Sequence, residues 1–275
     1  MSEVSVSRLF KPGAMFAAVA LTLLAGCSGD SGVVNSQSDE EAGLAGRDSG
    51  SRPLPVDTEI LQLRSTPNPD RNAYFGDLHI HTRYSFDAFV FGTIATPDDA
   101  YHYAKGHPLD HPSGYTMQLR EPLDFYAVTD HAMFMGLVQE SADTSSVFSS
   151  YAVAEPLHDI NAPDNMGQMS IPARSAAFSQ FIPNTLNGLM DGEIDAEVAR
   201  AVTASAWRDS VRAADEAYIP GQFTTFAAYE YTTSSDDRGN LHRNVIFRDT
   251  DRLPAIAWSR LHSQDPEELW DWMDG

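Results

Sequence analysis

Histidine and carboxylate side chains follow two short apolar segments of this chain in a pattern that could hold divalent metal ions. In Phe75–His81, His79 and His81 are two residues apart, so in a strand they would lie on one face. A second apolar segment, Phe125–His131, ends in Thr-Asp-His. Imidazole nitrogen suits zinc, manganese and iron, and carboxylate oxygen suits the harder of these ions. The residue types therefore predict a metal site without identifying the metal.

Similar residues recur farther along the chain. Asp87 follows the first segment on what we expect to be a loop. Phe223–Tyr231 is rich in β-branched and aromatic residues, which predicts a third strand with Glu230 near its end. Leu241–Phe247 is predicted to be a fourth strand, with His242 close to its start. Polar residues at several strand ends are typical of the functional face of an α/β barrel.

The order His-x-His, Asp, Thr-Asp-His, a strand-borne Glu and then His resembles the PHP superfamily, named for polymerase and histidinol phosphatase domains. Within it, Gly76–Ala88 and Asn240–Phe247 resemble a group of secreted or lipid-anchored bacterial proteins described mainly as a domain of unknown function. The resemblance runs from Ala73 to Gly275. It implies an α/β fold, a distorted (βα)7-type PHP barrel.

The resemblance also implies a set of ligands for up to three divalent ions, zinc, manganese or iron. His79 and His81 would bind a first ion, Glu230 would bridge it to a second that His242 also holds, and Asp87 with His131 would bind a third. Several members hydrolyse phosphoester bonds, and a metal-bound hydroxide would need no catalytic side chain beyond these ligands.

Three neighbours of the proposed ligands are candidates for supporting roles. Asp77 and Asp130 are expected behind the ligands, because metal-bound imidazoles commonly donate their other N–H to a carboxylate or carbonyl. Arg243 could contact an anionic substrate, although a structural ion pair would explain it equally well.

The end of the sequence departs from the family. The family supplies later ligands, a histidine and an Asp-x-His pair, and nothing after His242 matches them. Trp270–Gly275 falls inside a helix that is predicted to begin at Asp265–Glu268. We therefore expect a truncated chain with an incomplete barrel and metal shell, which leaves the activity of this form open.

The N-terminus predicts export. Arg8 and Lys11 precede the apolar stretch Ala14–Ala25, which suits a secretory signal better than a membrane span. Leu24-Ala25-Gly26-Cys27 resembles a bacterial lipobox, so Cys27, the only cysteine, would be lipidated, and no internal disulfide can form. Ser28 favours sorting to the outer membrane, facing the periplasm or the cell surface.

The N-terminal pattern, the composition and the resemblance together predict three parts: a lipoprotein signal peptide (1–26), a flexible linker (27–70) and a PHP-like domain (71–275). The linker is rich in Ser, Gly, Asp, Glu and Pro and cannot bury enough apolar surface to fold alone. The formal net charge of −21 disfavours nucleic acid as a partner. We expect a small-molecule substrate and a membrane contact through the lipid anchor alone, and the sequence does not specify an oligomeric state.

Local patterns predict two helices and two insertions. Thr96–Lys105 has a cap, a proline in the first turn and early acidic residues, and Val198–Tyr218 is amphipathic with Trp207 in the core. His107–Glu121 and Ser141–Asn187 are expected to be long loops that act as lids or shape a substrate site.

Three functional hypotheses follow. The first is a metal-dependent phosphoesterase acting on a small phosphorylated molecule. The second is hydrolysis of another ester, amide or phosphonate bond, because an activated water does not select the bond by itself. The third is a non-catalytic surface lipoprotein that retains the fold.

Overall fold

The structure, a computed structural model, describes residues 72–167, 170–235 and 239–274. The predicted signal peptide, Cys27 and the linker lie outside these residues. The strands are β1 (Gly76–Ile80), β2 (Leu109–His111), β3 (Tyr115–Met117), β4 (Phe125–Val128), β5 (Thr224–Thr225), β6 (Ala228–Ser235) and β7 (Gly239–Ile246). The α-helices are α2 (Phe86–Val90), α3 (Pro97–Ala104), α4 (Leu137–Ala142), α5 (Ile171–Asp191), α6 (Ala196–Ala217) and α7 (Pro266–Asp274).

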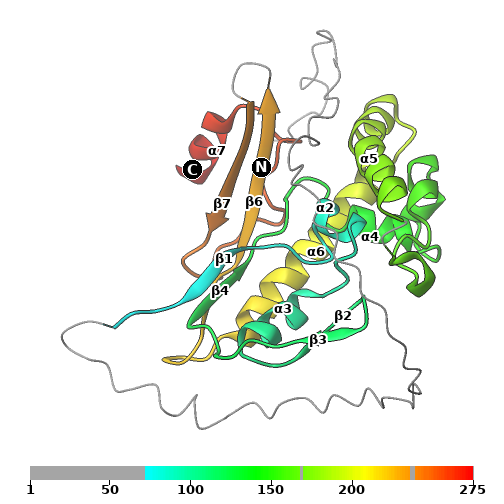
Figure 1. The fold of residues 1–275 in the computed structure, drawn as a ribbon. Coiled ribbons are helices and arrows are strands. Elements are labelled where there is room, and N and C mark those ends of the chain that lie inside the picture. The colour runs from blue at the N-terminus through cyan, green and yellow to red at the C-terminus, as the bar shows by residue number, and fades with distance from the viewer. Residues whose placement is uncertain (1–71, 168–169, 236–238, 275) are drawn as a thin grey trace, which may run out of the picture. The chain divides into compact units, whose positions relative to one another are not determined.

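The central sheet is parallel and has the strand order β1-β4-β5. β1 pairs with β4, with Ile80 opposite Val128, and β4 pairs with β5, with Phe125 opposite Thr224. Two antiparallel hairpins, β2–β3 and β6–β7, complete the described strands (Figure 1). The α/β class expected from the sequence is therefore confirmed, whereas the described strands form no closed barrel.

The third predicted strand is divided in two. Residues 223–231 were expected to form one strand, but β5 ends at Thr225 and β6 begins at Ala228. The division marks a change of partner, because β5 pairs with β4 in parallel and β6 pairs with β7 in the opposite direction. An isolated parallel bridge between His131 and Glu230 keeps β6 beside the chain that leaves β4.

The predicted helix at Thr96 is confirmed. α3 starts at Pro97, and the Thr96 hydroxyl accepts a hydrogen bond from the backbone N–H of Asp99 at 3.1 Å. The Asp99 carboxylate in turn accepts one from the backbone N–H of Thr96 at 2.9 Å. This reciprocal capping box satisfies two helix-end donors.

The amphipathic helix predicted before the Glu230 strand is α6. Its alanines at 213, 214 and 217 belong to one buried cluster with residues of α3 and with Tyr126 and Val128 of β4. Figure 1 shows α6 beside α3. Trp207 is 1% exposed, contacts the core residues of β6 and β7, and donates from Nε1 to the carbonyl of Pro254 at 2.9 Å. Its predicted place in the core is confirmed.

The expected long loop Ser141–Asn187 is largely helical, which corrects the prediction. It contains 3-10 helices at Phe148–Ser150, Ala152–Leu157 and Pro163–Asn165 and most of α5. The buried positions of α5 lie three or four residues apart, and its small and polar residues hid that periodicity in the sequence.

Arg174 joins α5 to the rest of this region. The side chain is buried, and its guanidinium donates to the carbonyls of Val90 at 2.6 Å, Ile160 at 2.5 Å and Asn165 at 2.8 Å. Val90 is the last residue of α2, so one side chain connects α2, α5 and the segment between α4 and α5.

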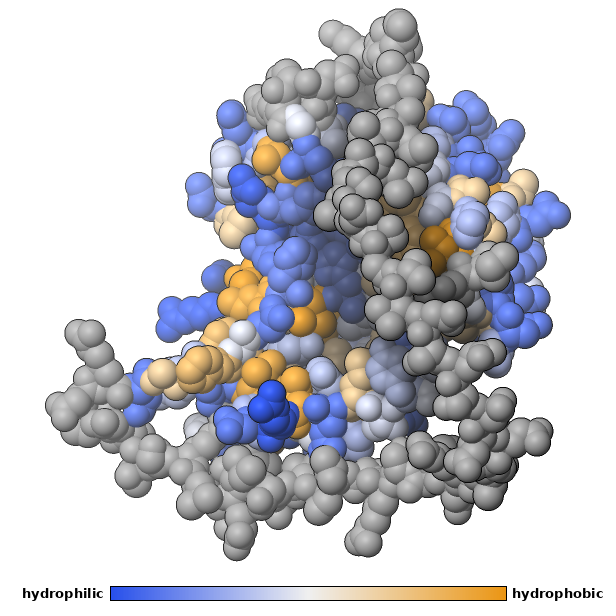
Figure 2. Space-filling model, in the orientation of Figure 1, coloured by the Kyte–Doolittle hydropathy of each residue, from blue (hydrophilic) through white to orange (hydrophobic). Residues whose placement is uncertain are grey.

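The second expected loop, His107–Glu121, contains the β2–β3 hairpin, with Leu109 opposite Met117. Figure 2 shows hydrophobic residues at the surface where β1 and β4 lie in Figure 1. Phe75, which precedes β1, is 67% exposed.

Among the described residues, no helix combines the length and apolar character needed to cross a membrane.

Candidate metal centre

The parallel strands bring the candidate ligands to one edge of the sheet. His81 directly follows β1, His131 lies three residues beyond β4, and Glu230 is the third residue of β6. The bridge between His131 and Glu230 places β6 beside the extension of β4. Because the carboxyl ends of parallel strands meet at the same edge, residues distant in sequence converge there.

Glu230 is the centre of this cluster. Its side chain is 0% exposed, and its Oε2 lies 2.8 Å from His81 Nε2, 3.2 Å from His79 Nε2 and 3.5 Å from His131 Nδ1. Its Oε1 contacts His242 Nδ1. One buried carboxylate therefore faces four imidazoles.

Asp87 occupies a second position between two of the same imidazoles. Its Oδ1 lies 3.2 Å from His81 Nδ1, and its Oδ2 lies 3.5 Å from His131 Nε2. Asp87 is in the first turn of α2 rather than on the expected loop. The helix begins immediately after Ser85, which fixes the direction of the Asp87 side chain.

These contacts form three groups whose potential ligand atoms lie within 4.8 Å of one another: His79, His81 and Glu230; His81, Asp87 and His131; and His131, Glu230 and His242. All six residues predicted as ligands are thus brought together. Imidazole nitrogen combined with carboxylate oxygen fits zinc, manganese or iron, so the residues suit a divalent metal ion without selecting one. Their role as ligands stays a prediction.

The charges of the cluster depend on one another. Burial alone would raise the pKa of Glu230, but hydrogen bonding to His81, the charge of His131 and hydrogen bonding to His242 lower it to about 2. Burial would lower the pKa of His81, but hydrogen bonds to Asp87 and Glu230 raise it to about 10. Burial would also raise the pKa of Asp87, but hydrogen bonds from His131, His81 and Ser85 hold it well below its usual range.

Three further residues orient the imidazoles, and the sequence reasoning missed them. The Ser85 hydroxyl lies 3.0 Å from His81 Nδ1 and donates to Asp87 at 2.5 Å. The Thr232 hydroxyl lies 2.7 Å from His131 Nδ1, and the Asn240 amide lies 2.7 Å from His242 Nε2. Strand alternation could have indicated two of them, because Thr232 shares a face with Glu230, and Asn240 shares one with His242.

The two aspartates expected behind the ligands act on the backbone instead. Asp130 accepts hydrogen bonds from the backbone N–H and the hydroxyl of Thr82. Asp77 accepts one from the backbone N–H of His79 at 3.0 Å. Among the described residues, no hydrogen bond joins either carboxylate to an imidazole, and the supporting role of the two aspartates stays a prediction.

Arg243 lies away from the cluster. It is the neighbour of His242 in β7, and successive strand residues point to opposite faces. Arg243 is paired with Tyr231, on the face of the hairpin opposite to Glu230, and its guanidinium donates to the carbonyl of His242 at 2.8 Å. This placement gives no support to the predicted contact with substrate.

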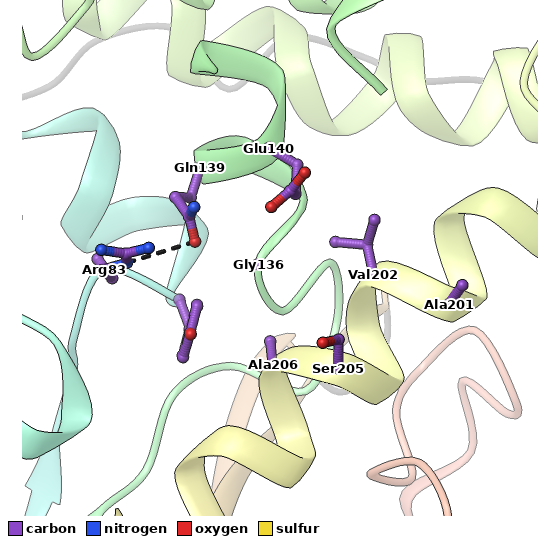
Figure 3. Close-up of a pocket in the computed structure, with 9 residues that line it drawn as sticks. Arg83, Gly136, Gln139, Glu140, Ala201, Val202, Ser205 and Ala206 are labelled. Atoms are coloured by element: carbon purple, nitrogen blue, oxygen red, sulfur yellow. Dashed lines mark hydrogen bonds between the residues drawn. The ribbon is translucent and has the colours of Figure 1, made fainter. Parts of the chain in front are cut away.

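The cluster is closed on one side and open on the other. The side chain of His131 is 5% exposed, whereas those of His242 and His79 are 38% and 58% exposed. A separate hollow of about 340 Å³, lined by residues that include Arg83, Gln139, Glu140 and Ser205, contains none of the six residues (Figure 3). The cluster is therefore open to solvent on the side of His79 and His242.

The protein is therefore an α/β protein with a cluster of histidine and carboxylate side chains beyond the carboxyl ends of its parallel strands. A family profile described as "Protein of unknown function (DUF3604)" matches residues 68–275, and the chain belongs to that family. Neither the comparison with curated proteins nor that with solved structures found a match.

Proposed function

We propose that this protein is a metal-dependent hydrolase of the PHP type that cleaves a phosphoester bond in a small phosphorylated molecule. The observation that carries the proposal is the buried Glu230 carboxylate, which faces four imidazoles in a cluster that also contains Asp87. Burying a carboxylate costs folding free energy, so an arrangement that serves only the stability of the fold would be unfavourable. The same carboxylate with four imidazole neighbours suits divalent ions. We also propose that the complete fold is a (βα)7-type barrel. This proposal is supported by the parallel strands β1, β4 and β5 and by the helices α3 and α6.

Bound divalent ions would polarise a phosphoryl oxygen and lower the pKa of a water molecule. The residues of the chain would hold these ions and fix their spacing. Glu230 offers one oxygen toward His79 and His81 and the other toward His242, so it is placed to bridge two positions. Asp87 and His131 define a third position.

The hydroxyls in the cluster are placed to orient ligands rather than to attack substrate. Ser85 is buried and donates to Asp87, and Thr232 contacts His131 and donates to Glu230 at 3.3 Å. A nucleophile requires a hydroxyl that is free to reach substrate and a base to activate it. The arrangement therefore favours hydrolysis by an activated water.

We further propose that the protein is an exported lipoprotein of the outer membrane, anchored through Cys27 and acting on small molecules rather than nucleic acid. The support is the N-terminal sequence pattern and the net charge of −21. Replacing Cys27 by serine should move the protein from the membrane fraction to the soluble fraction of the producing bacterium. Unchanged membrane association would contradict the anchor.

The activity is tested with a panel of phosphomonoesters, phosphodiesters and carboxyl esters in the presence of manganese or zinc. We expect turnover of a phosphoester, and His81→Ala should abolish it. His102→Ala is a matched control, because His102 is an exposed histidine on α3 outside the cluster. Equal turnover by His81→Ala and the unaltered protein would contradict the proposal.

A second candidate is hydrolysis of another ester, amide or phosphonate bond. The position of Arg243 on the opposite face favours keeping this alternative, because a cationic side chain beside the ions would have favoured phosphate. Turnover of carboxyl esters but not of phosphoesters would select it. Fewer than one bound metal ion per chain would favour the third hypothesis, a non-catalytic surface lipoprotein.

A further inference from the structure

The two strands that supply His79 and Glu230 are not neighbours in the described sheets. β1 pairs with β4, and β6 pairs with β7. The 3.2 Å approach of His79 Nε2 to Glu230 must therefore be set by other contacts. This is the least constrained part of the cluster, because the His79 side chain is 58% exposed.

The backbone that leads into His79 leaves the regular pairing of β1. The register between β1 and β4 shifts between Asp77 and Ile80. Irregularities of this kind redirect a side chain, and they leave backbone groups that need other partners.

Two side chains hold the peptide unit at this irregularity. The carbonyl of Leu78 accepts a hydrogen bond from Asn244 Nδ2 at 2.7 Å, and the N–H of His79 donates to Asp77 Oδ1 at 3.0 Å. These two groups belong to one planar peptide unit, so fixing both fixes the plane from which the His79 side chain departs.

Asn244 connects this peptide unit to the hairpin that carries Glu230. Asn244 of β7 lies directly opposite Glu230 of β6, and side chains of directly opposite residues lie on the same face. The Asn244 amide then reaches β1 and spans the gap between the two parts of the cluster.

We infer that Asn244, together with Asp77, is a positioning residue that sets His79 against Glu230 by clamping the Leu78–His79 peptide unit. The inference rests on the proposed metal centre and adds two residues that act on it through the backbone. Asn244 is exposed, so its hydrogen bond contributes little to folding stability and its main effect falls on the geometry of His79.

The test is the affinity of the full chain for Mn²⁺ and Zn²⁺, measured by competition with a chromogenic chelator. We expect Asn244→Leu and Asp77→Leu each to weaken the tightest site by about 10- to 100-fold, as loss of a supporting contact commonly does. Thermal unfolding of the metal-free variants should change little. Asp77→Asn keeps an acceptor oxygen without the charge and should retain most of the affinity.

A double-mutant cycle separates positioning from general destabilisation. Because Asn244 acts through His79, Asn244→Leu should add no further loss of affinity to His79→Ala. Asn240→Leu is the matched comparison, since Asn240 contacts His242 instead and its effect should add to that of His79→Ala. Additive losses for Asn244→Leu and His79→Ala, or wild-type affinity in Asn244→Leu, would overturn the inference.

A crystal structure of metal-free Asn244→Leu gives an independent readout. We expect His79 to have moved out of contact with Glu230 while His81 keeps its place. If the unaltered protein binds no metal, the proposed function fails, and this crystal structure still decides the role of Asn244. An unmoved His79 overturns the inference whatever the metal content.

Discussion

The buried carboxylate of Asp130 accepts two hydrogen bonds from Thr82, one from the backbone N–H at 2.5 Å and one from the hydroxyl at 2.6 Å. Both residues are buried, and each lies two residues beyond the end of its strand, β1 or β4. The pair therefore ties together the two chain segments that carry His81 and His131. Burial raises the pKa of Asp130 to about 6 even though the Thr82 bonds oppose the rise.

Thr82→Val tests this tie. Valine keeps the shape of threonine but removes the hydroxyl, which leaves a buried carboxylate oxygen without its donor. We expect the free energy of unfolding to fall by about 1–3 kcal/mol, measured by urea denaturation at neutral pH with chelator present. Thr82→Ser keeps the hydroxyl and is the control. Equal stability of the valine and serine variants would contradict the assigned role.

Glu230→Gln tests the sharing of ligands within the cluster. His81, His131 and Glu230 each belong to two of the three groups, and a neutral imidazole has one lone pair to offer. If His79, His81 and one oxygen of Glu230 hold one ion, Asp87 and His131 remain for a second position, and His242 with the other oxygen of Glu230 remains for a third. We therefore expect one tightly bound ion per chain and weaker binding at the other positions.

In Glu230→Gln the tight site should lose affinity on the order of 100-fold or more. The readouts are metal analysis after dialysis and titration with a competing chelator. Glu140→Gln is the control, because Glu140 lines the separate hollow of Figure 3. Three ions of equal affinity in the unaltered protein would contradict this division of ligands.

Metal affinity should rise with pH. Although burial opposes it, hydrogen bonding to Asp87 and Glu230 raises the pKa of His81 to about 10, so this imidazole carries a proton at neutral pH. A bound ion needs the neutral ring, so binding must release that proton. We expect the binding constant to increase about tenfold per pH unit for each proton released.

Isothermal titration in buffers of different ionisation enthalpy counts the released protons. A binding constant that does not change with pH would show that the metal ion displaces no proton from His81.

The sequence predicted which residues form the cluster better than it predicted the hydrogen bonds and helices that surround them. His79, His81 and His131 were found because strand alternation and strand ends are visible in the residue pattern. The hydrogen bond from the His79 N–H to Asp77 could not be predicted, because it lies at a shift in register that depends on how β1 pairs with β4. The α5 helix was missed because its buried face is made largely of small and polar residues and Arg174, whose partners are distant in sequence.

Thr96→Ala tests a feature that the sequence did predict. Alanine removes the side-chain acceptor of the Asp99 N–H at the start of α3. The free energy of unfolding should fall by about 1 kcal/mol, measured by chemical denaturation of the metal-free protein. Thr96→Ser should stay close to the unaltered protein. A Thr96→Ala variant of unchanged stability would show that the capping box does not stabilise α3 in solution.

The buried guanidinium of Arg174 has a consequence for the mobility of α5 beside the cluster. It holds the carbonyl of Val90 at the end of α2, the same short helix that begins beside Asp87. Moving α5 outward would leave the buried Arg174 cation without these acceptors, which would cost free energy, so we expect α5 to keep its place. Any ligand of the cluster would then enter from the solvent-facing side, where His79 and His242 are exposed.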